Sequence, residues 1–225
     1  QRKKLDHDIT EEAIRHINQS ELEPSKKTTV LFNANWHKGV IGIVASRLTE
    51  SFYRPTIILT ESNGLATGSA RSVEGFDLYY AISQCSEFLE NYGGHKYAAG
   101  LTLKIENIEP FKQKFERIVR ETIDDEMLTP QINIDAKIKL TDITPDLYHM
   151  LQKFAPFGPN NTIPVFMTEK VTNFIGTKRV GRNNEHLKLV IVDDTRACND
   201  RSGIGFGMGH LYDKVNSGGF FDICY

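Results

Sequence analysis

The 225-residue sequence has few of the features that identify several common protein classes. It holds only three cysteines, an odd number without a C-x-x-C pair, which argues against a zinc site or a disulfide scaffold and fits a reducing cytoplasm. It has no long apolar run and no signal-peptide pattern, so no membrane span is expected. The formal net charge of −2 gives no global sign of nucleic-acid binding, which must therefore come from a local patch.

Clusters of metal-binding side chains are also scarce. Asp6, His7 and Asp8 are consecutive in a predicted helix, where they point in different directions and cannot easily share one ion, so they are interpreted as a solvated face. The acidic pairs at positions 124–125 and 193–194 lack a nearby histidine with suitable spacing. No catalytic residue, metal site or cofactor site is therefore assigned to this chain.

What the sequence does contain is a change of hydrophobic period along the chain. Apolar residues at helical spacing predict an amphipathic linker helix over residues 1–24. Residues 25–128 then alternate short apolar and β-branched runs with helical patterns, which predicts an α/β domain with a mixed sheet. An acidic stretch followed by Thr129 and Pro130 marks the boundary with a third region, residues 129–225.

A glycine pair in the middle of the chain is a candidate anion site. Gly93, Gly94 and His95 fall between a helix expected over residues 77–90 and a strand expected from Leu101. Adjacent glycines permit positive φ and expose backbone N–H groups, which favours phosphate, and His95 can donate to the same anion. Taken alone, the three residues are more typical of a helix C-cap and a turn with an idle histidine.

A second candidate lies on the strand expected over residues 65–72. Small residues on this strand let another backbone or a ligand approach closely. Arg71 offers a planar fork for bidentate phosphate recognition, and Ser69 and Ser72 add hydroxyl donors. The alternative is a surface arginine in an ordinary ion pair, and the phosphate role is preferred here.

A third candidate precedes the helix that is expected to begin near Gly39. His37 and Lys38 lie in the loop before it, and the N-terminus of a helix attracts anions. His37 fits a phosphate-binding role and an idle surface position equally well. Trp36, beside it, is interpreted as a partly buried anchor that fixes the loop rather than as a base-stacking residue.

Three segments in this order resemble one known domain. Residues 36–48, 68–72 and 92–100 resemble the DHH-associated domain of DHH phosphoesterases, the last through the signature Gly-Gly-His-x-x-Ala-Ala-Gly. The amino-acid sequences of all three segments are similar to those of the RecJ family of single-strand-specific DNA exonucleases. The resemblance implies a phosphate- or nucleic-acid-binding site made of Ser69, Arg71, Ser72, Gly93, Gly94, His95 and His37.

Beyond residue 129 the pattern changes to that of strands. Alternating apolar residues over 132–140 predict a β-strand, Thr144 and Pro145 predict the start of a short helix, and several short strand-like runs follow. This pattern predicts a small β-barrel. The segments Pro156-Phe157-Gly158 and Pro164-Val165-Phe166 are similar to the block that opens the OB-fold domain of the RecJ family, and the barrel is expected to be incomplete.

A basic patch in this third region is a weaker candidate for contacts with a nucleic-acid strand. Its residues are Lys178, Arg179, Arg182 and Lys188. Phe166, Phe174 and Phe206 lie near them in the sequence. Cations that follow the backbone and rings that stack on bases are typical of single-strand binding. A solvated hairpin over a phenylalanine core fits the same residues equally well.

The resemblance implies the C-terminal substrate-binding portion of a RecJ-like 5′-to-3′ single-stranded-DNA exonuclease, a cytoplasmic hydrolase of DNA repair and recombination. Its phosphodiester hydrolysis, dependent on Mn²⁺ or Mg²⁺, is expected to reside in a catalytic domain that this chain lacks. The chain alone is therefore expected to bind single-stranded DNA without cutting it, and no other partner is indicated. Two alternatives stay open: part of a DHH-family oligoribonucleotide or cyclic-dinucleotide phosphodiesterase, and a non-enzymatic nucleic-acid-binding module.

Overall fold

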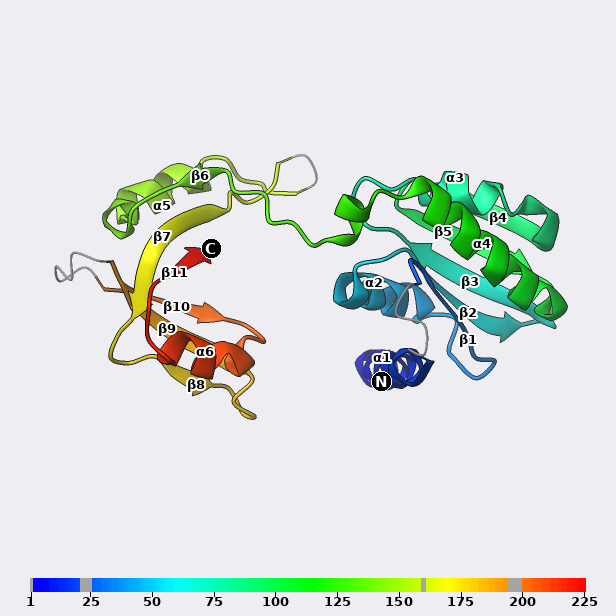
Figure 1. Ribbon diagram of the computed structural model, residues 1–225, viewed down its shortest axis with the longest axis horizontal. Coiled ribbons are helices and arrows are strands. Elements are labelled where there is room, and N and C mark those ends of the chain that lie inside the picture. Colours follow the sequence, from blue (N-terminus) through cyan, green and yellow to red (C-terminus); the bar gives the residue numbers. More distant parts are fainter. Residues whose placement is uncertain (1, 21–25, 159–160, 194–199) are drawn as a thin grey trace. The chain divides into compact units, whose positions relative to one another are not determined.

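The computed structural model describes residues 2–20, 26–158, 161–193 and 200–225 (Figure 1). The chain separates into two compact units, residues 1–131 and 132–225. The sequence prediction set this boundary after residue 128. The predicted end of the linker helix at residue 24 and the cysteine at position 198 lie outside the described residues.

A five-stranded mixed sheet forms the centre of the first unit, with strand order β1-β2-β3-β5-β4. Its strands are β1 (Thr29–Phe32), β2 (Thr56–Ser62), β3 (Leu65–Arg71), β4 (Leu89–His95) and β5 (Ala98–Leu103). β1 and β2 are parallel and need a crossover, which a helix provides. All other neighbours are antiparallel. The β2–β3 hairpin turns at Asn63 and Gly64, which both have the positive φ that an Asn-Gly turn favours.

Helices cover both faces of this sheet (Figure 1). One face carries α1 (Arg2–Ser20) and α2 (Ile41–Phe52), and the other carries α3 (Leu78–Ser83) and α4 (Ile108–Thr122). Because successive residues of a strand point to opposite faces, Ile58 joins the α1–α2 core whereas Ile57 and Leu59 join the α3–α4 core. Short 3₁₀ turns complete the unit at Ser86–Phe88, Ile105–Asn107 and Asp125–Leu128.

The α1–α2 contact confirms the amphipathic helix but corrects one interpretation. Ile9, Ala13 and Ile17 are buried against α2, as their spacing predicts. Asp6, which was assigned to a solvated face, is only 5% exposed and pairs with Arg47 of α2 at 2.7 Å. The apolar stripe is therefore extended by an ion pair whose carboxylate is buried, and the spacing of apolar residues does not reveal such a pair.

The expected helix over residues 77–90 is wrong in its second half. Asp77 caps the helix, with its side chain accepting a hydrogen bond from the Tyr80 N–H at 2.9 Å, but α3 ends at Ser83. Cys85 is fully buried, and burial raises the pKa of its thiol to about 12. From Leu89 onward the chain pairs with β5, because that pairing satisfies backbone groups that a longer helix would have satisfied locally.

This correction moves the glycine pair from a loop into a strand. Gly93, Gly94 and His95 are the last three residues of β4, at the edge of the sheet, and the turn that follows is Lys96-Tyr97. The argument that the pair cradles an anion within a loop therefore does not apply, and the exposed surface of the strand takes its place.

An open, six-stranded sheet forms the second unit, with order β10-β9-β7-β11 and with β6 and β8 paired to β7 and β9. Its strands are β6 (Ala136–Lys137), β7 (Phe166–Asn173), β8 (Lys178–Val180), β9 (His186–Val192), β10 (Arg201–Gly205) and β11 (Phe221–Cys224). Its helices are α5 (Pro145–Gln152) and α6 (Tyr212–Asn216), with 3₁₀ turns at Leu140–Asp142 and Gly209–Leu211. Within the described ranges the strands do not close into a barrel, although β7 is strongly curved (Figure 1).

The core of this unit is small, and one expected strand forms only in part. Leu140, Val171 and Ile191 are its buried centre. Of the strand predicted over residues 132–140, only Ala136 and Lys137 pair, because β7 offers them a two-residue register. The predicted helix start is confirmed by Thr144, whose hydroxyl caps α5. None of the described helices is long and apolar enough to span a membrane.

Candidate nucleic-acid interface

Arg71 and His95 lie in one row across three strands of the first sheet. The register places Arg71 beside Ala98, and Ala98 beside His95. Because neighbouring strands are about 4.8 Å apart, the two ends of the row are separated by roughly 10 Å. Ala70, the neighbour of Arg71, is fully buried on the opposite face. Two of the predicted phosphate-binding residues are thus brought onto one side of the sheet.

A second row, made of small residues, crosses the same three strands beside the row of Arg71, Ala98 and His95. Ser69 pairs with Gly100, and Gly100 pairs with Gly93. Both glycines are exposed, so the sheet is bare here and its backbone faces solvent. This surface, made of Arg71, Ala98, His95, Ser69, Gly100 and Gly93, is called the clasp face below. A phosphodiester backbone can approach it without meeting bulky side chains.

The first turn of α2 lies over one end of the clasp face. A Cβ atom on Gly42 would lie 3.2 Å from both the Arg71 Nη2 and the Ser69 Oγ, so the helix approaches these side chains closely. The helix N-cap, Val40, provides no side-chain hydrogen bond. The N-terminal N–H groups and the helix dipole therefore favour an anion beside Arg71.

The guanidinium of Arg71 is oriented by neutral groups. Its Nη1 donates to the Ser69 hydroxyl at 3.0 Å and to the Ala70 carbonyl at 2.8 Å. In the part of the chain that the structure describes, no carboxylate forms an ion pair with it. The alternative of an ordinary surface ion pair thus finds no support, and the charge of Arg71 is available to a ligand.

Both candidate histidines are exposed and are held in the same way. His37 Nδ1 accepts the Gly39 N–H at 3.0 Å, and His95 Nδ1 accepts the Tyr97 N–H at 3.4 Å. When Nδ1 accepts, the ring proton of the neutral imidazole resides on Nε2, which is then free to donate outward. Trp36 is 4% exposed, and this buried position matches its interpretation as a loop anchor.

The absence of a side chain has a different structural basis at Gly93 and at Gly94. Gly94 has φ +150°, and a Cβ there would lie 2.3 Å from the Ala98 carbonyl oxygen, so the fold itself requires glycine. A Cβ on Gly93 would meet nothing within 4 Å. Packing therefore does not require glycine at position 93. The lack of a side chain there leaves the clasp face uncovered.

Ser72 is not part of either row. It follows the last residue of β3, and its hydroxyl donates to the Phe76 carbonyl at 3.2 Å. Its backbone N–H donates to the Tyr97 carbonyl at 3.1 Å. The structure therefore uses Ser72 to hold the segment between β3 and α3 against the turn that follows His95.

In the second unit, two of the four predicted basic residues face each other. Lys178 of β8 pairs with Lys188 of β9, so two cations lie side by side. The ring of His186, two residues from Lys188, contacts Phe206 edge-on at 5.3 Å. Phe206 is 75% exposed, so the interpretation of the phenylalanines as core is wrong for this one. Basic and aromatic side chains thus share one region of this unit.

Arg179 has a different role from its neighbours. Its Nε donates to the Gly209 carbonyl at 3.0 Å, its Nη2 pairs with Asp213 at 2.6 Å, and its guanidinium lies 4.8 Å from the centre of the Tyr212 ring. These contacts hold α6 and the turn before it, so its guanidinium is engaged within the protein. Arg182 is exposed in the turn between β8 and β9.

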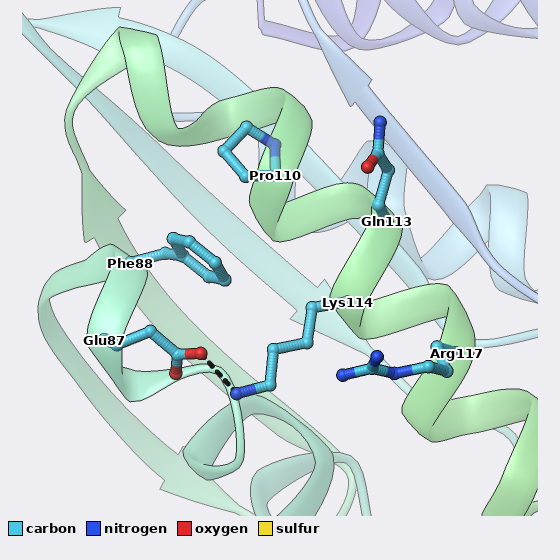
Figure 2. A pocket seen from close by; sticks show the side chains of 6 residues that line it. All are labelled: Glu87, Phe88, Pro110, Gln113, Lys114 and Arg117. Carbon is cyan, nitrogen blue, oxygen red and sulfur yellow. Dashed lines mark hydrogen bonds and ion pairs between the residues drawn. The ribbon is translucent and has the colours of Figure 1, made fainter.

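A groove of about 520 Å³ lies between α4 and the 3₁₀ turn before β4, on the α3–α4 side of the sheet (Figure 2). Its lining residues are Glu87, Phe88, Pro110, Gln113, Lys114 and Arg117. Figure 2 shows Lys114 reaching Glu87, with which it forms an ion pair, and Arg117 lying beside it. No predicted site residue lines this groove, and α4 places it on the side of the sheet opposite the clasp face.

Metal-binding groups are not found together in the described ranges. No group of three or more histidine, cysteine, aspartate and glutamate side chains there lies close enough to hold an ion. The polar groups gathered around Arg71 are donors: its own fork, the hydroxyl of Ser69 and the N-terminus of α2, with His95 roughly 10 Å along the row. Such a set suits an anion.

Known proteins match both units. Residues 25–121 match the DHHA1 domain, and residues 134–225 match the RecJ OB domain. The single-stranded-DNA-specific exonuclease RecJ of Bacillus subtilis is 33% identical over 99% of this chain, and that of Haemophilus influenzae is 30% identical over 72% of it. A crystal structure of Thermus thermophilus RecJ with Mg²⁺ covers 84% of the chain, with a TM-score of 0.69 and 25% identity.

These matches define the class of protein as a DHHA1 domain followed by an OB domain. The chain belongs to the RecJ family, and the resemblance inferred from three sequence segments is confirmed. It spans 28% of the length of the B. subtilis protein, 28% of the H. influenzae protein and 28% of the T. thermophilus chain.

Proposed function

We propose that this chain is the substrate-binding portion of a RecJ-like 5′-to-3′ single-stranded-DNA exonuclease and that the clasp face holds a phosphate of the strand. The observation that carries this proposal is Arg71, a cation without a carboxylate partner in the described residues, oriented by Ser69 beside the first turn of α2. Phosphate contacts of this kind position a nucleic acid without reading its sequence.

Each donor has a defined task in this proposal. Arg71 presents its remaining N–H groups to two oxygens of one phosphate, and the Ser69 hydroxyl and the α2 N-terminus donate to the same group. His95, roughly 10 Å along the row, donates through Nε2 to the next phosphate. The bare backbone at Gly93 and Gly100 lets the strand lie close to the sheet.

The hydrolytic step belongs to residues outside this chain in the same proposal. The T. thermophilus RecJ structures hold Mg²⁺ or Mn²⁺. A divalent metal in the longer protein would activate water and stabilise the charge that develops on the phosphate. The part of this chain is to fix the position and direction of the strand, in a cytoplasmic enzyme of DNA repair and recombination.

The second unit would hold the strand further along. Lys178 and Lys188 supply adjacent positive charges, and Phe206 with His186 offers rings on which bases can stack. The match of residues 134–225 to the RecJ OB domain supports this assignment over the alternative of a small oligoribonucleotide or cyclic-dinucleotide phosphodiesterase.

Fluorescence anisotropy of the 225-residue chain with a short labelled single strand of DNA tests the proposal. Binding should weaken steeply with salt, because phosphate contacts release counterions. Arg71→Ala should weaken it, whereas Arg117→Ala, an exposed arginine of the groove on the opposite side of the sheet, should not. Equal binding by wild type and Arg71→Ala would contradict the proposal. A titration with an RNA strand of the same sequence measures the preference for DNA.

A further inference from the structure

One carboxylate of α1 holds the loop that precedes α2. Glu12 accepts a hydrogen bond from the Asn33 Nδ2 at 2.9 Å on one oxygen and from the Trp36 Nε1 at 3.1 Å on the other. The partners are 21 and 24 residues away in the sequence. The Glu12 side chain is 37% exposed, so both bonds are partly shielded from water.

The same loop leads to two exposed donors, His37 and Lys38, which precede the N-terminus of α2 beside the clasp face. The Trp36 carbonyl accepts a hydrogen bond from the buried hydroxyl of Thr60 at 2.5 Å, which fixes the loop from the sheet side. His37 and Lys38 follow and are exposed. The His37 carbonyl accepts the N–H of Val40, the N-cap of α2, at 3.0 Å. The residues before these donors are therefore anchored inward, and the donors lie at the helix N-terminus.

The docking of α1 has other contacts besides those of Glu12. Ile9, Ala13 and Ile17 bury the helix against α2, and Asp6 pairs with Arg47. Glu12 contacts the loop through its two hydrogen bonds, and its Oε1 also lies 3.8 Å from the His16 Nε2 of the same helix. Removing its negative charge should therefore release the loop while the helix stays in place.

We propose that Glu12 is a positioning residue for single-stranded DNA. It transmits the docked state of α1 to His37 and Lys38, so that the linker helix sets the strength of the clasp. This inference rests on the proposed function of the clasp face. It adds Glu12 to the residues that control DNA binding, although Glu12 itself touches no DNA and lies in a segment with no phosphate-binding pattern.

The test compares Glu12→Gln with Glu11→Gln in the same 225-residue chain. Both variants remove one negative charge from α1, but Glu11 is exposed and only Glu12 bonds to the loop. The chain has a single tryptophan, Trp36, so its fluorescence reports on the loop directly. We expect Glu12→Gln to shift that emission and to weaken single-strand binding roughly three- to tenfold, within the range usual for residues that act through others.

Two readouts separate positioning from a general loss of structure. Glu12→Gln should lower the salt dependence of binding by about one phosphate contact, which is the change also expected of Lys38→Ala. In a chain that already carries both His37→Ala and Lys38→Ala, adding Glu12→Gln should weaken single-strand binding little further. The effects of coupled residues are not additive. Circular dichroism should show the same helix content in both glutamine variants.

The possible outcomes are distinguishable. If Arg71→Ala weakens binding but Glu12→Gln and Glu11→Gln bind alike, the positioning role is wrong and the clasp remains. The positioning role is also wrong if Glu12→Gln lowers the affinity by the same factor in a chain that carries His37→Ala and Lys38→Ala. The effect of Glu12 would then not pass through the loop. If Arg71→Ala has no effect, the clasp proposal fails and this inference fails with it.

Discussion

Arg71 in the first unit and Arg179 in the second both lie on strands near other polar groups, but their surroundings differ. Arg71 is oriented by a hydroxyl and a backbone carbonyl and has no ion pair among the described residues. Arg179 is bound by Asp213, by a backbone carbonyl and by the face of Tyr212. The guanidinium of Arg71 thus lacks a carboxylate partner among the described residues, whereas that of Arg179 is paired within its own unit.

The difference shows that counting cations in a sequence overestimates the charge available to a ligand. Arg179 belongs to the basic patch by position, but α6, more than thirty residues later, neutralises it. Arg71 lies in a chain with an excess of acidic residues and still keeps its charge. Availability is thus decided by tertiary partners, and the following variants test it in order of decreasing effect.

Arg71→Ala should have the largest effect on DNA. It removes charge-assisted hydrogen bonds to phosphate, each contributing about 1.5–3 kcal/mol, so affinity should fall roughly ten- to a hundredfold. Thermal unfolding should change little, because the lost internal bonds are to neutral groups. Arg71→Lys, which keeps the charge without the fork, should give an intermediate affinity. Anisotropy titrations at one fixed salt concentration measure all three.

Arg179→Ala should show the opposite profile. Loss of its backbone hydrogen bond, its exposed ion pair and its contact with Tyr212 should lower the stability of the second unit by about 1–2 kcal/mol. Single-strand affinity should stay within about twofold of wild type under conditions in which the variant is folded. Urea unfolding and anisotropy together check this, and a tenfold loss of affinity at unchanged stability would refute the contrast with Arg71.

Gly93→Leu tests the bare surface of the clasp face. A side chain at Gly93 meets nothing in the protein, so the fold should tolerate it, but it would occupy the space of the strand. Affinity should fall on the order of fivefold, equivalent to about 1 kcal/mol. Gly94→Ala is the matched contrast: it should lower stability by about 1–3 kcal/mol or more, because its φ and its contact with the Ala98 carbonyl exclude a Cβ.

Lys178→Ala and Lys188→Ala should have the smallest effects. Each removes one exposed cation from the second unit, so affinity should fall only about two- to threefold and the salt slope by about one contact. The two lysines are cross-strand neighbours of like charge, so stability should rise slightly in either variant. If these losses exceed that of Arg71→Ala, the main grip lies in the second unit.

Much of the fold could be predicted because its signals are local. The caps at Asp77 and Thr144, the Asn63-Gly64 turn and the apolar stripe of α4 each act within a few residues. The strand predicted over residues 132–140 forms only at Ala136 and Lys137, for a non-local reason. Alternation makes a segment able to pair, but Ile132 found no partner strand and is 66% exposed.

The candidate site was predictable in its members but not in its arrangement. Arg71 and His95 were expected to act together, and the register places them in one row. Gly100, which completes the neighbouring row, was missed, although a glycine between the buried Ala99 and Leu101 is a signal that could have found it. Glu12 was missed because hydrogen bonds to Trp36 leave no trace in periodicity.

The position of β4 at the edge of its sheet has a consequence for how copies of the chain behave in concentrated solution. A regular edge strand offers a template on which another molecule can add its own strand. β4 is irregular at both ends: its register shifts between Leu89 and Asn91, and Gly94 has a positive φ. The clasp face, which we propose binds a nucleic acid, is therefore bordered by an edge that discourages self-association.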